Sequence, residues 1–260
     1  MTPMLPLHEA HSYRALMRRW RELARRLGVR LQTLAVVEDL PVCWLETGAK
    51  GAMAGEAAVY LSSGVHGDEP GAAWGLLVWA EENVDRLRAG RFLIFPCLNP
   101  HGLQRNTRVD HLGQDLNRRF HVAEDAVCGP WRQVVAGRRL AVGLCLHEDY
   151  DGQGCYVYEL GRRGRPRLAP DMLAGVRAIP PDGRRRIDES RAAGGVIHKS
   201  RVPKHLPGMP EAVVLHELGC GLTLTFETPS EFGLDVRVRA QVEFVNAVLS
   251  GMCIAGNTGE

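Results

Sequence analysis

A histidine and a glutamate separated by two residues follow a short apolar run in the first third of the chain. His66 and Glu69 lie in the segment Ser-Ser-Gly-Val-His-Gly-Asp-Glu-Pro, which comes directly after the apolar residues 57–61. A tight, glycine-containing turn at the end of a buried strand can direct an imidazole nitrogen and a carboxylate oxygen at one divalent ion. Catalytic zinc takes such ligands, provided that a third protein ligand is present and one coordination position stays open for water. The pattern is short, so its meaning depends on the residues further along the chain.

His147 is the candidate for the third ligand. It ends the apolar run 143–146 and is followed by Glu148 and Asp149. A histidine at a strand end more commonly has a structural role, and the two acids could orient its ring by accepting a hydrogen bond. Glu148 is an alternative ligand, but neighbouring side chains on a strand point to opposite faces.

Two further segments carry polar groups with a chemical use. In Asp-Leu-Asn-Arg, Asn117 and Arg118 could bind a carboxylate through several donors, although an ordinary surface loop is the simpler interpretation. Glu227 ends a strongly apolar run, where burial of a carboxylate without a partner is costly. Beside an activated water, such a glutamate could take a proton and later pass it to a leaving amine. The pair His216-Glu217 is expected on a short helix over residues 210–218, with a structural role.

Hydrophobic patterning predicts the elements that position these residues. A helix over residues 13–27 is bounded by Ser12 and Gly28, and two more helices are predicted over residues 70–88 and 231–249. Strands are predicted at residues 31–37, 42–45, 57–62, 92–98, 140–146 and 222–226. Their alternation with helices predicts an α/β fold. We expect a single three-layer domain over residues 1–260, a mixed, mostly parallel twisted sheet with helices on both faces.

This architecture gathers the candidate residues at one edge. Open α/β sheets bind ligands beyond the carboxyl ends of their strands. His66, Asn99, His147 and Glu227 each follow or end a predicted strand. They are therefore expected to converge.

Composition limits the class of protein and of partner. The chain has 260 residues, 45% hydrophobic and 24% charged, which is typical of a globular protein. Its formal net charge of +2 does not indicate nucleic-acid binding. Residues 161–205 nevertheless contain twelve Lys or Arg against four Asp or Glu. Residues 161–208 are interpreted as a loop-rich excursion that is solvated, binds a polyanion, or attracts an anionic substrate.

The same reasoning predicts a cytoplasmic location. Seven cysteines without paired spacing favour free thiols in a reducing compartment. The N-terminal segment contains Arg14, Arg18 and Arg19 and lacks a continuous apolar core, so no signal peptide is predicted. No apolar run reaches the length of a membrane span, and no membrane partner is expected.

In combination, the motifs resemble the zinc carboxypeptidase family, which includes carboxypeptidase A and the succinylglutamate desuccinylase and aspartoacylase branch. The motifs in chain order are His66-x-x-Glu69, Asn99-Pro-x-Gly102, Arg108, Asp115-Leu-Asn117-Arg118, His147 and Glu227 before Thr-Pro. The resemblance implies one zinc ion per chain, bound by His66, Glu69 and His147, with Glu227 as general base. It also implies that Arg108, rather than its rival Arg105, polarises the scissile carbonyl. Asn117 and Arg118 would bind the terminal carboxylate of the substrate.

The implied activity is hydrolysis of an amide bond next to a free carboxylate, on short or cell-wall-derived peptides. Deacylation of N-acyl amino acids is the alternative, and an inactive polyanion-binding module is a third hypothesis. The partner would be a small molecule or short peptide with a free carboxylate, not a nucleic acid, and the oligomeric state is not indicated. Family carboxypeptidases carry a tyrosine upstream of the base, but no tyrosine lies between Tyr158 and Glu227. That role is therefore absent or has moved to Tyr156 or Tyr158.

Overall fold

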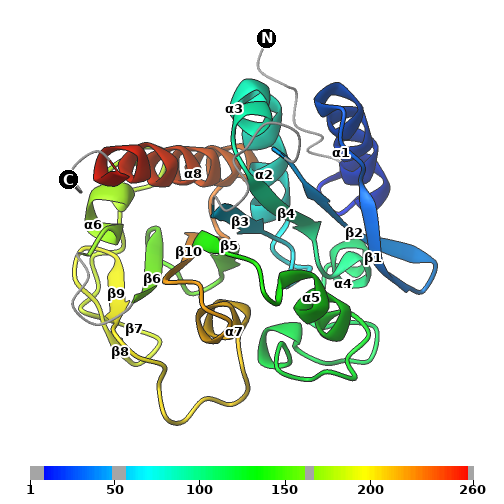
Figure 1. Ribbon diagram of the computed structural model, residues 1–260. Coiled ribbons are helices and arrows are strands. Elements are labelled where there is room, and N and C mark those ends of the chain that lie inside the picture. The colour runs from blue at the N-terminus through cyan, green and yellow to red at the C-terminus, as the bar shows by residue number, and fades with distance from the viewer. Residues whose placement is uncertain (1–8, 49–56, 162–166, 257–260) are drawn as a thin grey trace.

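An eight-stranded sheet forms the centre of the protein in a computed structural model that describes residues 9–48, 57–161 and 167–256 (Figure 1). Across the sheet, the strands follow the order β1 (Gln32–Val37), β2 (Leu40–Glu46), β4 (Phe92–Cys97), β3 (Ala58–Ser62), β5 (Leu140–Asp149), β10 (Leu222–Pro229), β6 (Tyr156–Gly161) and β9 (Val196–Lys199). The four central strands β4, β3, β5 and β10 are parallel, whereas β2 and β6 run antiparallel to their inner neighbours.

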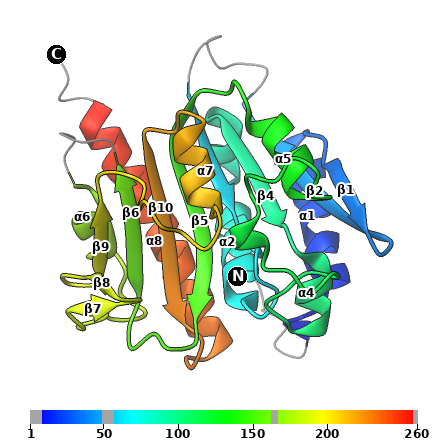
Figure 2. The same ribbon diagram turned by 90° about the horizontal axis from the view of Figure 1, so that it is seen from below.

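Helices cover both faces of this sheet, so the predicted α/β fold is confirmed. Figure 2 shows α1 (Tyr13–Leu27), α2 (Pro70–Glu82) and α8 (Leu234–Gly256) behind the sheet, and α5 (Cys128–Val135) and α7 (Glu211–Glu217) in front of it. The alternation of side chains along the strands separates two cores. On β5, Val142, Leu144 and Leu146 pack against the face of α2 and α8, whereas Cys145 packs against the face of α7.

Local signals explain where the helices begin and end. Ser12 Oγ accepts a hydrogen bond from the Ala15 amide at the start of α1, and Gly28 ends the helix with a φ of 70°. The single helix predicted over residues 70–88 is wrong, because the chain breaks into α2 and α3 (Val84–Ala89) at Asn83. The Asn83 side-chain amide donates to the Trp79 carbonyl at 2.8 Å, so the side chain takes over an acceptor of the helical backbone.

The segment expected as a loop-rich excursion has more regular structure than its composition indicates. It contains α6 (Ala169–Leu173), a hairpin of β7 (Arg186–Ile187) and β8 (Ser190–Arg191), and the edge strand β9. Residues 162–166 of this segment lie outside the described ranges. Because β9 pairs in parallel with β6, the segment extends the main sheet and supplies its edge strand on the side of β6 (Figures 1 and 2).

Six cysteines are buried, and within the described ranges none of these six forms a disulfide bond. In the described parts of the chain, no helix has the length and apolar character needed to cross a membrane.

Candidate metal and active site

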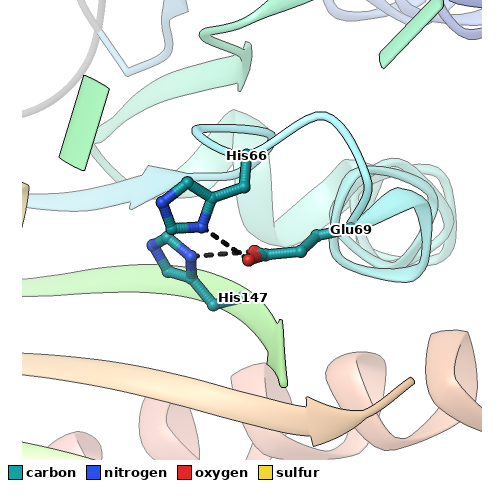
Figure 3. A group of neighbouring side chains, drawn as sticks. All are labelled: His66, Glu69 and His147. Atoms are coloured by element: carbon teal, nitrogen blue, oxygen red, sulfur yellow. Dashed lines mark hydrogen bonds and ion pairs between the residues drawn. The ribbon is translucent and has the colours of Figure 1, made fainter. Parts of the chain in front are cut away.

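Three buried side chains converge at the carboxyl ends of the central strands. His66 follows β3, Glu69 precedes α2, and His147 lies near the end of β5 (Figure 3). The Nδ1 atom of His66 lies 2.5 Å from Glu69 Oε1, and Nδ1 of His147 lies 2.9 Å from Glu69 Oε2. One donor atom from each residue lies within 4.8 Å of the others, and each residue is at most 3% exposed. The expected convergence of two imidazoles and one carboxylate is therefore present.

The turn that carries His66 and Glu69 is held by close backbone packing. A side chain at Gly67 would place its Cβ atom 1.8 Å from the carbonyl carbon of Gly102, so only glycine fits there. The Gly67 amide also donates to the carbonyl of Thr107 at 3.0 Å. This contact joins the His66 turn to the loop that precedes Arg108.

The Asn-Pro-x-Gly motif has a structural role in the same region. Asn99 Oδ1 accepts a hydrogen bond from the Gly102 amide and caps α4 (Pro100–Arg105). Its amide nitrogen donates to the carbonyl of Val109 at 3.1 Å. Asn99 therefore positions the loop that holds Arg108, and it does not line the cavity described below.

Asp115 is a functional candidate to which the sequence motifs assigned no separate role. Its Oδ1 atom lies 3.1 Å from His66 Nε2, the ring nitrogen that faces away from Glu69. Its Oδ2 atom accepts hydrogen bonds from Arg108 Nε and Nη2 at 3.2 and 3.1 Å. Asp115 thus orients the ring of a candidate ligand and a candidate catalytic arginine together. The only signal in the sequence is its place at the head of Asp-Leu-Asn-Arg.

The electrostatics of the three converging residues fit a divalent cation. Burial raises the pKa of Glu69, but the adjacent His66 and His147 outweigh this effect and lower it to about 2. Burial lowers the pKa of His66, but Glu69 and Asp115 outweigh this effect and raise it to about 9. Burial lowers the pKa of His147 as well, but Glu69 outweighs this effect and raises it. The Glu69 carboxylate and the two rings thus stabilise positive charge at one point, which is also what a bound divalent cation would supply.

Glu227 lies beside this cluster. On β10 its Cα pairs with that of His147 on one side and that of Tyr156 on the other. Burial raises the pKa of Glu227 well above its usual range; the negative charge of Glu69 adds to this effect, and His147 opposes it. A carboxyl group with a raised pKa is suited to accepting and returning a proton near neutral pH.

A cavity of about 730 Å³ opens over these residues and brings together six of the seven predicted site residues. His66, Glu69, Arg108, Asn117, Arg118 and Glu227 line it, and the seventh, His147, contacts Glu69. Arg108 extends along the wall, with Nη1 3.7 Å from Glu69 Oε1. Its rival Arg105 is exposed on α4 and does not line the cavity.

The two carboxylate-binding candidates also stabilise the wall. Asn117 Oδ1 accepts a hydrogen bond from the Glu211 amide at 3.0 Å, which fixes the start of α7. The carbonyl of Arg118 accepts a hydrogen bond from the Met209 amide at 3.1 Å. A short 3-10 helix (Leu116–Arg118) presents both residues to the cavity.

Neither the alternative ligand Glu148 nor the alternative pair His216-Glu217 belongs to the cluster of His66, Glu69 and His147. Glu148 points to the opposite face of β5, where it accepts hydrogen bonds from the Gly71 amide and from Arg237 Nη1 at 2.9 and 2.8 Å. His216 and Glu217 lie on α7 and do not line the cavity.

Two tyrosines of β6 line the cavity near Glu227. The Tyr156 hydroxyl donates to Asp149 at 3.0 Å, and the Tyr158 hydroxyl donates to Asp188 at 2.5 Å. Strand β6 is therefore both part of the main sheet and part of the cavity wall.

Comparison with known proteins agrees with this geometry. The model of the family described as the succinylglutamate desuccinylase/aspartoacylase catalytic domain matches residues 56–141. The fold matches a presumed metallopeptidase from Shewanella denitrificans with a TM-score of 0.81, at 22% identity over 93% of this chain and 90% of that one. The resemblance to the zinc carboxypeptidase family is confirmed.

Two further solved structures have the same fold. A metallo-carboxypeptidase from Burkholderia cenocepacia aligns with a TM-score of 0.70 and 17% identity, over 94% of this chain and 70% of that one. A metallo-carboxypeptidase from Pseudomonas aeruginosa, in complex with (2-guanidinoethylmercapto)succinic acid, aligns with a TM-score of 0.57 and 19% identity. The alignment covers 90% of this chain and 68% of that one. No curated protein sequence is significantly similar. The family match and the carboxypeptidase-like fold point to a hydrolytic enzyme.

Proposed function

We propose that this protein is a zinc-dependent hydrolase that cleaves an amide bond next to a free carboxylate, in the manner of a carboxypeptidase acting on short peptides. One observation carries the proposal. A buried His66–Glu69–His147 cluster, the carboxyl group of Glu227 and the guanidinium of Arg108 all border one cavity or contact its lining. Bound by the three ligands, zinc would polarise the scissile carbonyl and lower the pKa of water to about 7.

Each of the other residues has a defined task in this proposal. Glu227 accepts a proton from the attacking water and returns it to the leaving amine. Arg108, oriented by its two hydrogen bonds to Asp115, stabilises the negative charge that develops on the carbonyl oxygen. Arg118 and Asn117 bind the free carboxylate of the substrate, because a guanidinium and an amide supply several donors to its oxygens.

Deacylation of an N-acyl amino acid is the second candidate, and the family match favours it. The matched catalytic domain is named after enzymes that remove an acyl group from an amino acid, and residues 56–141 include His66, Glu69, Arg108, Asn117 and Arg118. Both reactions need the same metal cluster, base and carboxylate-binding residues. They differ in the group on the far side of the amide bond. The Pseudomonas neighbour is in complex with a succinic acid derivative, a small dicarboxylate, which supports a substrate that carries a carboxylate.

Metal analysis and a substrate panel test the proposal. We expect about one zinc ion per chain by inductively coupled plasma mass spectrometry, loss of activity on chelation, and recovery with zinc. Turnover would be measured on N-acyl amino acids and on short peptides, including peptides with D-amino acids or diaminopimelate. Faster hydrolysis of peptides supports the carboxypeptidase assignment, and faster hydrolysis of acyl amino acids supports the deacylase. An active protein that contains no metal and resists chelators would refute both.

A further inference from the structure

The helix that begins beside Glu69 is capped by a residue of another element. Glu69 occupies the N-cap position of α2, but its carboxylate points toward His66 and His147 instead of the helical amides (Figure 3). The first turn of a helix has backbone amides without helical acceptors, and a negative charge there is stabilising. Glu148 supplies that charge, since its Oε2 atom accepts a hydrogen bond from the Gly71 amide at 2.9 Å. The residue that follows one candidate ligand therefore caps the helix that begins at another.

Close packing allows Glu148 to reach the backbone of α2. A Cβ atom at Gly71 would lie 2.2 Å from Glu148 Oε1, so a larger residue would displace the carboxylate from the helix. The Thr228 hydroxyl, on the neighbouring strand β10, lies 3.3 Å from the same oxygen. Glu148 also borders the cavity, but its side chain is fully buried and both of its oxygens are engaged within the protein. A carboxylate buried in this way requires a compensating charge.

Helix α8 carries the compensating charge. Arg237 Nη1 donates to both oxygens of Glu148 at 2.8 Å, and the arginine side chain is 12% exposed. One turn further along α8, the fully buried Gln241 donates from Nε2 to the backbone carbonyl of His147 at 2.8 Å. The three candidate ligands come from other elements. Helix α8 nevertheless contacts the backbone of His147 and, through Glu148, holds the start of the helix that follows Glu69.

We propose that Glu148 and Arg237 are positioning residues, which fix the Glu69 carboxylate relative to the His147 ring and thereby set the affinity of the site for a divalent metal. Glu148 lies next to His147 on β5, and its hydrogen bond to Gly71 joins this strand to α2. Glu69 and His147 are 78 residues apart in the chain, so their separation depends on such contacts between elements. The inference rests on the metal site of the proposed function, but not on the reaction assigned to it.

Metal affinity and a cobalt spectrum test this role without turnover. Zinc affinity would be measured by competition with a chromophoric chelator. In Glu148→Gln and Arg237→Met we expect it to fall by about 10- to 100-fold, the range for loss of a group that orients a ligand. The visible absorption bands of the Co(II)-loaded protein report ligand geometry, so they should change in both variants. Arg237→Lys keeps the charge but not the planar fork of donors, and its loss of affinity should be smaller than that of Arg237→Met.

A second arginine–glutamate pair, at the other end of α2, provides the control. Arg19 Nε donates to Glu81 Oε1 at 2.9 Å, and the two side chains are 19% and 15% exposed. Arg19→Met and Glu81→Gln remove the same chemical groups from the pair of α1 and α2. They should lower the urea midpoint of unfolding but leave zinc affinity and the cobalt spectrum native. Native affinity and a native spectrum in Glu148→Gln and Arg237→Met would overturn the proposal. Equal losses of affinity in Glu81→Gln and Glu148→Gln would also overturn it, because affinity would then follow overall stability.

A milder pair of variants keeps the test decisive if Glu148→Gln and Arg237→Met do not fold. Arg237→Lys and Arg19→Lys both retain the positive charge. Weaker zinc binding in Arg237→Lys alone supports the positioning role, whereas equal affinities in these two variants would overturn it.

The same measurements separate this inference from the proposed function. If the Glu148 and Arg237 variants bind zinc more weakly but the native protein hydrolyses no substrate of the panel, the positioning role stands and the assigned reaction fails. If the native protein is active and these variants keep native affinity, the reaction stands and the positioning role fails. A native protein that binds neither zinc nor cobalt refutes both.

Discussion

Glu227 lies directly opposite His147 in the parallel pairing of β10 with β5. Residues paired in this way share one face of the sheet, so backbone hydrogen bonds hold the candidate base beside a candidate ligand. Neither side chain depends on a mobile loop for its position. Groups held on regular elements keep their geometry better than groups on loops, and such precision is needed for proton transfer.

Replacement of Glu227 by glutamine should separate metal binding from catalysis. The three ligands remain, so the metal content should stay near that of the native protein, while the rate falls by about 10²- to 10⁴-fold because the proton acceptor is lost. Metal content and kcat measured on the same preparation check this. Glu217→Gln, an exposed change on α7, is the control and should have native activity. A turnover number within a few-fold of native would show that Glu227 is not the base.

Asp115→Asn should weaken metal binding by about 10- to 100-fold, because the ring of His66 loses the carboxylate that accepts from its outer nitrogen. The asparagine keeps an oxygen that can accept from the Asn117 amide, so the turn should persist. Competition with a chromophoric chelator measures the affinity. Asp151→Asn, at an exposed position, is the matched change. Unaltered affinity in Asp115→Asn would mean that this hydrogen bond has no effect on the ligand.

Arg108 and Arg105 can be distinguished by a pair of methionine variants. Arg108→Met should lower kcat by about 10²- to 10³-fold, since a cation that faces a developing oxyanion stabilises mainly the transition state. Arg105→Met should retain native kinetics, because Arg105 is exposed on α4 outside the cavity. Steady-state kinetics on the best substrate of the panel decide between them. The opposite result would transfer the role to Arg105.

Gly67→Ala should destabilise the protein by about 3 kcal/mol or more, at or beyond the upper end of typical overpacking costs. The added methyl group would overlap the backbone at Gly102 and Leu103, which cannot move without displacing α4. Gly183→Ala is the control, since nothing lies within 4 Å of its Cβ position, and its effect should stay within about 0.5 kcal/mol. Urea unfolding measures both. Equal midpoints would show that the His66 turn can shift to accommodate a side chain.

Local sequence signals were sufficient for several elements of the fold. Helix α1 has its predicted bounds because its cap residue, its apolar stripe and its terminal glycine all lie within seventeen consecutive residues, from Ser12 to Gly28. Strand β4 is a continuous apolar run covered on both faces, as expected of a central parallel strand. Each of these signals spans only a few residues. Short-range interactions are therefore enough to determine the bounds of these elements.

Strand β9 and the role of Asp115 were not predicted, because their partners are distant in sequence. Val196–Lys199 is too short to stand out, and it becomes a strand only by pairing with β6, which is about forty residues earlier. Asp115 acquires its role from His66, which is 49 residues away. Neither the pairing of β9 with β6 nor the contact of Asp115 with His66 leaves a periodic pattern in the sequence.

The residue types needed for a metal site, a base and a carboxylate-binding pair can all be read from the linear sequence, because chemistry depends on side-chain identity and the motifs keep their order. Their arrangement in space depends on the fold. His147 meets Glu69 across 78 positions only because β3 and β5 are neighbours in the sheet. The same sheet pairing places Lys199 beside Leu160 and Thr223 on one face. Long-range strand register, which no local pattern encodes, therefore decides which groups share the cavity.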